Sequence, residues 1–257
     1  MFWLNGMPGV GKSTIACSVV EVLRYSGVPT VSFFCQRAVQ DRNDGKRIVQ
    51  TLIYGLACDL PQFRECLLSE LAKREFDTDD PAPPVHYSNE QKKIFHTSLK
   101  ATEYAGKAVL LLDALDECSG ESNQVRLAKW LFELTQECNW LKVIVTSRPY
   151  PVIFKYFTTG NIAEKIRVLT IDYTTSPDNP HALSTFDDVV SYTRHRFPGV
   201  DDETVSLLAE KAQGLFQWTA IASKYFQRAV VKQKVIQRLL VVSPRHSQSV
   251  MQKLYEY

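Results

Sequence analysis

A glycine-rich run near the start of the chain has the residue types and spacing that hold phosphate. Residues 6–13 read GMPGVGKS, which matches the pattern Gly-x-x-x-x-Gly-Lys-Ser/Thr in full. Glycines let such a loop turn tightly and direct successive backbone N–H groups at phosphate oxygens. We expect Lys12 to reach the β- and γ-phosphates and the Ser13 hydroxyl to bind Mg²⁺. The predicted nucleotide-binding residues run without a break along the loop and into the next helix: Gly6, Met7, Pro8, Gly9, Val10, Gly11, Lys12, Ser13 and Thr14.

A second group of residues is acidic. Residues 109–117 read VLLLDALDE, an apolar run followed by Asp113, Asp116 and Glu117. A carboxylate at the end of a buried strand beside a phosphate loop anchors Mg²⁺, and we assign this role to Asp113. Asp116 and Glu117 follow three and four positions later, and either can polarise a water that attacks the γ-phosphate. The alternative is that these acids only favour the start of a helix.

Arg148 lies in the sequence Thr-Ser-Arg-Pro, at the end of the fourth expected strand. The carboxyl ends of parallel strands line the ligand crevice of an open α/β sheet. A guanidinium group at that place can bind a γ-phosphate through two hydrogen bonds. The alternative is a surface arginine that caps nearby carbonyl groups.

The elements that must position these residues alternate along the chain. Short apolar runs alternate with helical patterns, which is typical of βαβ units around a parallel sheet. The expected strands are residues 2–4, 30–35, 108–112, 141–146 and 166–171, and the expected helices include 47–60, 63–73, 91–102 and 125–136. The fold class is therefore α/β, a P-loop NTPase three-layer sandwich with a five-stranded parallel sheet.

The pattern changes after the fifth expected strand. Residues 174–184 are rich in Pro, Ser and Asn and are interpreted as a linker, and the rest of the chain has helical periodicity. We therefore expect a nucleotide-binding domain over residues 1–180 and a small all-helical domain over 181–257. The first strand and the last helix both look cut, so we also expect a piece of a longer protein, truncated before any winged-helix domain.

Composition narrows the function further. The net charge of +2 favours neither a nucleic-acid groove nor an acidic substrate. The six cysteines have no metal-ligand spacing and indicate a reduced, cytoplasmic protein. No apolar window is long enough for a membrane span.

Four motifs together resemble the NACHT domains of STAND-class signalling ATPases, above all the fungal and nephrocystin-3-like sets. They are GMPGVGKST, LLLDALDEC, VIVTSRP and GLFQW at residues 214–218, and the likeness runs from Trp3 to about Phe226. The resemblance implies strand order 2-3-4-1-5, Asp113 at the metal, hydrolysis by Asp116 or Glu117, and Arg148 as the γ-phosphate sensor. It also implies that the helical domain closes over the nucleotide.

These observations favour a slow ATPase switch that is ADP-bound at rest and ATP-bound when active, with Mg²⁺ as its metal. Protein partners or self-association through flanking domains are expected. Two alternatives stay open: a non-hydrolysing interaction module and a P-loop small-molecule kinase. GTP is disfavoured because the chain has no Asn-Lys-x-Asp motif for guanine.

Overall fold

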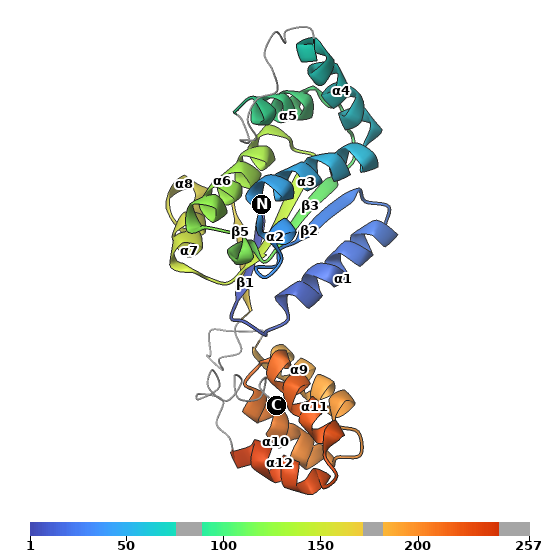
Figure 1. The fold of residues 1–257 in the computed structure, drawn as a ribbon, viewed down its shortest axis with the longest axis vertical. Helices are drawn as coiled ribbons and strands as arrows, with labels where there is room; N and C mark the ends of the chain where they lie inside the picture. The colour runs from blue at the N-terminus through green and yellow to red at the C-terminus, as the bar shows by residue number, and fades with distance from the viewer. Residues whose placement is uncertain (76–88, 172–181, 242–257) are drawn as a thin grey trace. The chain divides into compact units, whose positions relative to one another are not determined.

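The computed structural model describes residues 1–75, 89–171 and 182–241 (Figure 1). The chain divides into two compact units, the first formed by residues 1–5 and 12–169 and the second by residues 6–11 and 170–257. The expected boundary at residue 180 lies outside the described residues, as does most of the expected linker. The division into domains 1–180 and 181–257 therefore stays a prediction.

A five-stranded parallel sheet forms the centre of the first unit. Its strand order is β2-β3-β4-β1-β5, which confirms the order expected from the resemblance. Every strand lies within two residues of its predicted bounds: β1 Phe2–Gly6, β2 Thr30–Phe34, β3 Ala108–Asp113, β4 Leu141–Ser147 and β5 Arg167–Ile171.

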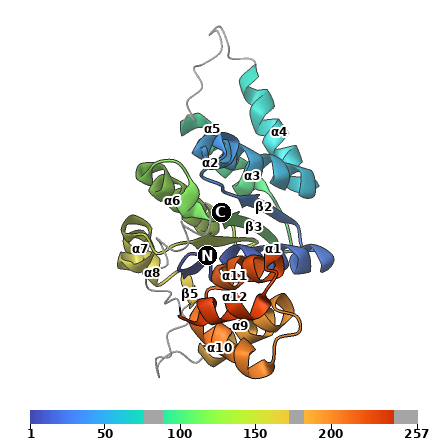
Figure 2. The ribbon, with the colours of Figure 1, turned by 60° about the horizontal axis from the view of Figure 1, so that its bottom comes forward.

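Helices cover both faces of this sheet and make the three layers expected (Figures 1 and 2). Helix α1 packs on one face, where Leu111 of β3 meets Ala16 and Val20. Leu110 and Leu112 point to the other face and join the large core with α3 and α6, because successive strand residues alternate between faces. The helical bounds are α1 Lys12–Tyr25, α2 Gln40–Asn43, α3 Gly45–Asp59, α4 Pro61–Glu75, α5 Asn89–Ala101, α6 Glu121–Glu137, α7 Pro151–Thr158 and α8 Gly160–Ala163.

Local sequence explains where several of these helices begin. The Asp44 carboxylate accepts a hydrogen bond of 2.9 Å from the Lys46 N–H and caps the start of α3. Helix α7 was not predicted from the sequence. Its signal is Pro151 at the first helical position, followed by Ile153 and Phe157, which are both fully buried.

The second unit contains four described helices around a separate apolar core. They are α9 Ala182–Arg196, α10 Asp202–Ala212, α11 Phe216–Arg228 and α12 Lys232–Val241. Val189, Leu208, Trp218 and Phe226 are among the side chains that meet at its centre. Within residues 1–75, 89–171 and 182–241, we find no helix with the length and apolarity needed to cross a bilayer.

Candidate functional site

The register of the sheet brings the ends of four strands to one edge. Phe34 pairs with Asp113, and Asn5 pairs with Ser147. Leu112 pairs with Val145, so β3 and β4 finish within about one residue of each other at this edge of the sheet. The segments that follow these strand ends carry the residues singled out in the sequence, so the parallel sheet explains why residues far apart in the chain meet.

The phosphate loop follows β1 in the chain. Gly9 and Gly11 have φ values of +81° and +93°, a region that glycine adopts without steric cost. Lys12 then opens helix α1. Burial lowers the pKa of the Lys12 amine, and the nearby carboxylates of Asp116 and Asp113 partly oppose this shift. A partly desolvated ammonium group that faces acids is suited to bind a phosphate strongly.

The carboxylate of Asp113 is buried between two hydroxyl groups. Thr146 donates a hydrogen bond to Asp113 Oδ1, and the Ser13 hydroxyl also bonds to this carboxylate. Burial nevertheless raises the pKa of Asp113, while the two hydrogen bonds and Lys12 oppose the rise. A bound cation would favour the ionised form that burial disfavours.

Ser13 and Asp113 fit the requirements of a Mg²⁺ ion. They offer a hydroxyl and a carboxylate oxygen, which are the hard donors that Mg²⁺ prefers, and their mutual hydrogen bond shows that they are neighbours. Magnesium sites usually take only one or two protein ligands, with phosphates and waters completing the shell. In the described residues no cluster of three or more His, Cys, Asp or Glu side chains forms a metal cage, which is compatible with such an open site.

The turn after β3 has a constrained backbone. Ala114 adopts a left-handed conformation with φ of +55°, which costs energy for any residue other than glycine. Its N–H donates to Thr146 Oγ1 at 2.9 Å, so the hydroxyl of Thr146 links the turn to β4. The buried Gln124 side chain donates to the carbonyl groups of Asp116 and Cys118 at 3.0 and 2.8 Å. These contacts hold the short 3₁₀ helix Leu115–Glu117 in place.

Asp116 is held by the arginine that follows β4. Its Oδ1 accepts a hydrogen bond of 2.9 Å from the Arg148 N–H. Its Oδ2 lies 3.3 Å from Arg148 Nε, an approach that makes an ion pair but not a well-directed hydrogen bond. The Asp116 side chain is only 2% exposed, whereas that of Arg148 is 35% exposed. A carboxylate held in this way is poorly placed to receive a proton from water.

Glu117 has a more open environment. Its side chain is 28% exposed, and its Oε1 lies 3.8 Å from Arg148 Nη2. Its Oε2 accepts a hydrogen bond of 3.0 Å from the N–H of Arg37, a residue in the segment after β2. The guanidinium group of Arg37 donates to the Asp116 carbonyl at 3.0 Å. Of the two acids left open by the sequence, Glu117 is therefore the one that solvent reaches.

Comparison with known proteins agrees with this geometry. A family model described as Nephrocystin 3, N-terminal, matches residues 1–148, which is more than half of the chain. The chain belongs to this family. It is a NACHT/nephrocystin-like P-loop NTPase, which confirms the resemblance inferred from its motifs.

Individual relatives of this nephrocystin-like NTPase support the assignment. The vegetative incompatibility protein HET-E-1 of Podospora anserina is 24% identical over 271 residues, covering all of the chain and 19% of the relative. A cancer-related nucleoside-triphosphatase homolog of Mus musculus is 46% identical over 46 residues, which are 18% of the chain and 23% of that protein. The chain thus matches only about a fifth of the length of either relative.

A solved structure supports the fold of the NTPase independently. The Walker-type ATPase of Pyrococcus abyssi superposes with a TM-score of 0.55 at 14% identity, covering 99% of the chain and 70% of the ATPase. At this identity the likeness concerns the fold alone. Together with the family match, it identifies a nucleotide-binding NTPase module.

Sequence reasoning missed two residues of the site. Thr146 contacts both Asp113 and Ala114, and Arg37 contacts both Asp116 and Glu117. Both lie at or just beyond the carboxyl end of a strand that neighbours β3. A polar side chain at that position of an adjacent parallel strand was the signal that could have identified each of them.

Proposed function

We propose that the chain is an ATP-binding and slowly ATP-hydrolysing NACHT module. The observation that carries this proposal is the cluster at the sheet edge, where Arg148 pairs with Asp116 and Glu117 and the charges of Asp113, Asp116 and Glu117 act on the Lys12 amine. Three carboxylates and two cations at one strand edge can bind phosphate, hold a divalent metal and activate water.

Each residue has one role in the proposed reaction. The loop from Gly6 to Thr14 binds the phosphates, and Lys12 contacts the β- and γ-phosphates. Ser13 and Asp113 hold Mg²⁺, which neutralises charge on the phosphate oxygens when bound. Glu117 accepts the proton of the attacking water, because its carboxylate is the more open of the two candidates.

Asp116 has a positioning role in this proposal. It holds the backbone and the side chain of Arg148, which would bind the γ-phosphate. Arg148 must leave at least Glu117 to do so, because its guanidinium group pairs with both acids in the described arrangement. Competition between carboxylate and phosphate for one arginine supports slow turnover.

The experiment that tests hydrolysis compares two isosteric variants. Glu117→Gln should keep binding of Mg²⁺-ATP and abolish phosphate release, because it removes only the proton acceptor. Asp116→Asn should retain part of the activity, because it weakens the position of Arg148 without removing the acceptor. Wild-type turnover by Glu117→Gln would exclude Glu117 as the base, and full loss only in Asp116→Asn would give that role to Asp116.

A non-hydrolysing nucleotide-binding module is the second candidate. The ion pairs of Arg148 with Asp116 and Glu117 favour it, because they occupy the groups that hydrolysis needs. This second function would be supported if the wild-type chain binds Mg²⁺-ATP but releases no more phosphate than Glu117→Gln does.

We further propose that the module is a signalling switch with a role like the one that HET-E-1 is named for, vegetative incompatibility. We propose that it acts in the cytoplasm with protein partners. A nucleotide can shift a switch only through its different affinity for two states. ATP analogues, but not ADP, should therefore change hydrogen exchange in α9, and Arg148→Ala should erase the difference. Equal exchange with both nucleotides would show that this chain binds without switching.

A further inference from the structure

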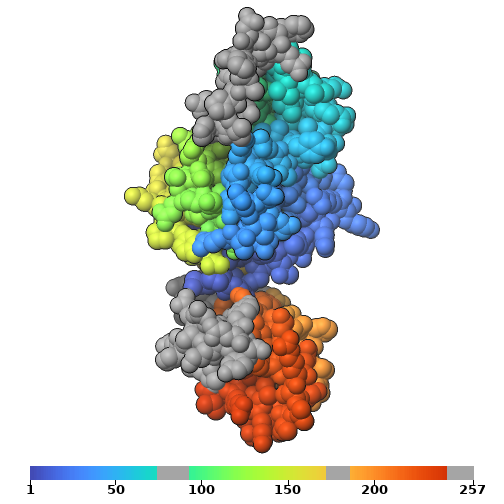
Figure 3. Space-filling view, in the orientation of Figure 1, coloured from blue at the N-terminus to red at the C-terminus, as the bar shows by residue number. Residues whose placement is uncertain are grey.

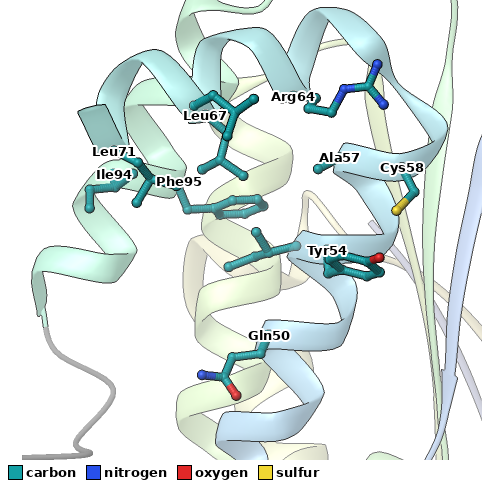
Figure 4. Close-up of a pocket in the computed structure, with 11 residues that line it drawn as sticks. Gln50, Tyr54, Ala57, Cys58, Arg64, Leu67, Leu71, Ile94 and Phe95 are labelled. Carbon is teal, nitrogen blue, oxygen red and sulfur yellow. The ribbon is translucent and has the colours of Figure 1, made fainter. Parts of the chain in front are cut away.

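A hollow lined mainly by apolar side chains lies in the first unit and contains none of the residues of the nucleotide site. Its volume is about 550 Å³, and it is lined by residues of α3, α4 and α5. Figure 4 shows Leu67 and Leu71 of α4 directed toward Ile94 and Phe95 of α5. The side chains that line this hollow give it an apolar centre, so an occupant must be largely apolar as well.

The apolar surface continues beyond the hollow onto its rim. Tyr54 of α3 is 73% exposed, and Leu68 and Leu71 of α4 are 58% and 42% exposed. Helices α3 and α4 form one continuous surface in the space-filling view (Figure 3). A small molecule inside the hollow would leave this rim in water, whereas a helix about 10 Å wide would cover the hollow and the rim together.

One end of the hollow carries a positive charge. Arg64 is the one charged residue among the described lining residues. It makes no ion pair with any other residue that the structure describes. Figure 4 shows Arg64 at the end near Tyr54 and Cys58, away from Leu71 and Ile94. An occupant with an acidic group at one end would complement this charge.

We propose that the surface formed by α3, α4 and α5 is a docking groove for an amphipathic helix of another protein. The partner helix presents apolar residues at positions i, i+4 and i+7 to the groove and an acidic residue to Arg64. This mode uses the apolar face of the helix for affinity and the charge for orientation. It is independent of the proposed nucleotide chemistry, because the lining contains no residue assigned to that site.

The direct test uses synthetic helical peptides as probes. Each stapled peptide carries Leu at i, i+4 and i+7, with Glu one turn before or one turn after this stripe, and matched peptides carry Lys in place of Glu. Binding to the nucleotide-free chain is measured by fluorescence anisotropy. One of the two Glu peptides should bind saturably, and its Lys counterpart should bind about two- to five-fold more weakly. Arg64→Glu should reverse this preference.

Groove and control variants locate the binding. Leu68→Glu should weaken binding about ten-fold, because a charge replaces an apolar contact at the rim. Val22→Glu on α1 is the matched control, since Val22 is also exposed but does not line the groove. It should bind the peptide like the wild type, while preserved circular dichroism shows that both variants fold.

Two native cysteines give a second readout on the unmodified chain. Cys58 lines the groove, and Cys17 is exposed on α1. Saturating peptide should slow maleimide labelling of Cys58 and leave that of Cys17 unchanged.

Any of four results would overturn the proposal. Neither Glu peptide binds saturably, or Leu68→Glu and Val22→Glu change peptide binding equally. Alternatively, Arg64→Glu leaves the preference for Glu over Lys unchanged, or the peptide binds without protecting Cys58. Protection of Cys58 by dodecanoate but not by the peptides would assign the groove to a small apolar anion. A dimer in sedimentation that Leu68→Glu dissociates would assign it to a second copy of the chain.

Discussion

Replacing Arg148 by methionine removes the cation next to a buried carboxylate. The hydrogen bond from the Arg148 N–H to Asp116 Oδ1 would remain, but Oδ2 would lose the Nε group that lies 3.3 Å away. Breaking a fully buried ion pair costs about 3–5 kcal/mol. Because the Arg148 side chain is 35% exposed and one bond survives, we expect a smaller loss, about 2 kcal/mol of unfolding free energy.

A double-mutant cycle isolates this interaction. Asp116→Asn removes the charge that Arg148 compensates, so Arg148→Met should cost about 1–2 kcal/mol less in that background than in the wild type. Urea unfolding of the nucleotide-free chain, followed by tryptophan fluorescence, measures the four stabilities. Three of the four tryptophans, Trp3, Trp130 and Trp140, belong to the core of the first unit, so the signal reports mainly on that unit.

An exposed ion pair supplies the control for this cycle. Arg194 Nε lies 3.0 Å from Asp202 Oδ1 in the second unit, and both side chains are exposed. Arg194→Met should therefore change stability by less than about 1 kcal/mol. Additive effects of Arg148→Met and Asp116→Asn, within about 0.5 kcal/mol, would refute the inference that Arg148 stabilises the buried charge of Asp116.

Two further predictions concern the end of β3. Burial raises the pKa of Asp113, so the folded chain holds this proton more tightly than the unfolded chain and loses stability as pH rises through the raised pKa. Without Mg²⁺, Asp113→Asn should therefore melt at a higher temperature than the wild type at pH 7 and lose this advantage at acidic pH. Mg²⁺-ATP should stabilise the wild type more than the variant, and an advantage of the variant that is independent of pH would contradict burial as its cause. Ala114→Val should lower the unfolding free energy by about 1 kcal/mol or more, because a branched side chain fits poorly at φ of +55°. Ala114→Gly should not lower it. Equal stability of the two variants in urea unfolding would contradict that reasoning.

Most of the sheet could be predicted because its strands carry strong local signals. The five apolar runs predicted the strands within two residues, and the resemblance predicted their order. Strands β1, β3 and β4 are largely buried, and buried parallel strands are continuously apolar, whereas β5 is mostly exposed. Helix α7 was missed because it is only eight residues long and begins two residues after Pro149. Short helices of this kind are stabilised by tertiary packing, which periodicity does not show.

The composition of the site was easier to predict than its internal contacts. Lys12, Ser13 and Asp113 follow from motif spacing, and the structure places them together. Motif spacing did not predict the pairing of Asp116 with Arg148, because this pairing depends on how the turn at Ala114 directs the side chains that follow it. Adjacent acids in a sequence can point to different surroundings, and here that difference separates Asp116 from Glu117.

Titration calorimetry with Mg²⁺-ATP tests the central claim most directly. The wild-type chain should bind one nucleotide, and Lys12→Ala should bind at least about ten-fold more weakly, because each charge-assisted hydrogen bond to phosphate contributes about 1.5–3 kcal/mol. Unchanged circular dichroism would show that the variant is folded. Equal affinity of the two proteins for Mg²⁺-ATP, or no binding by the folded wild type, would contradict the assignment of residues 6–14 as the phosphate-binding loop.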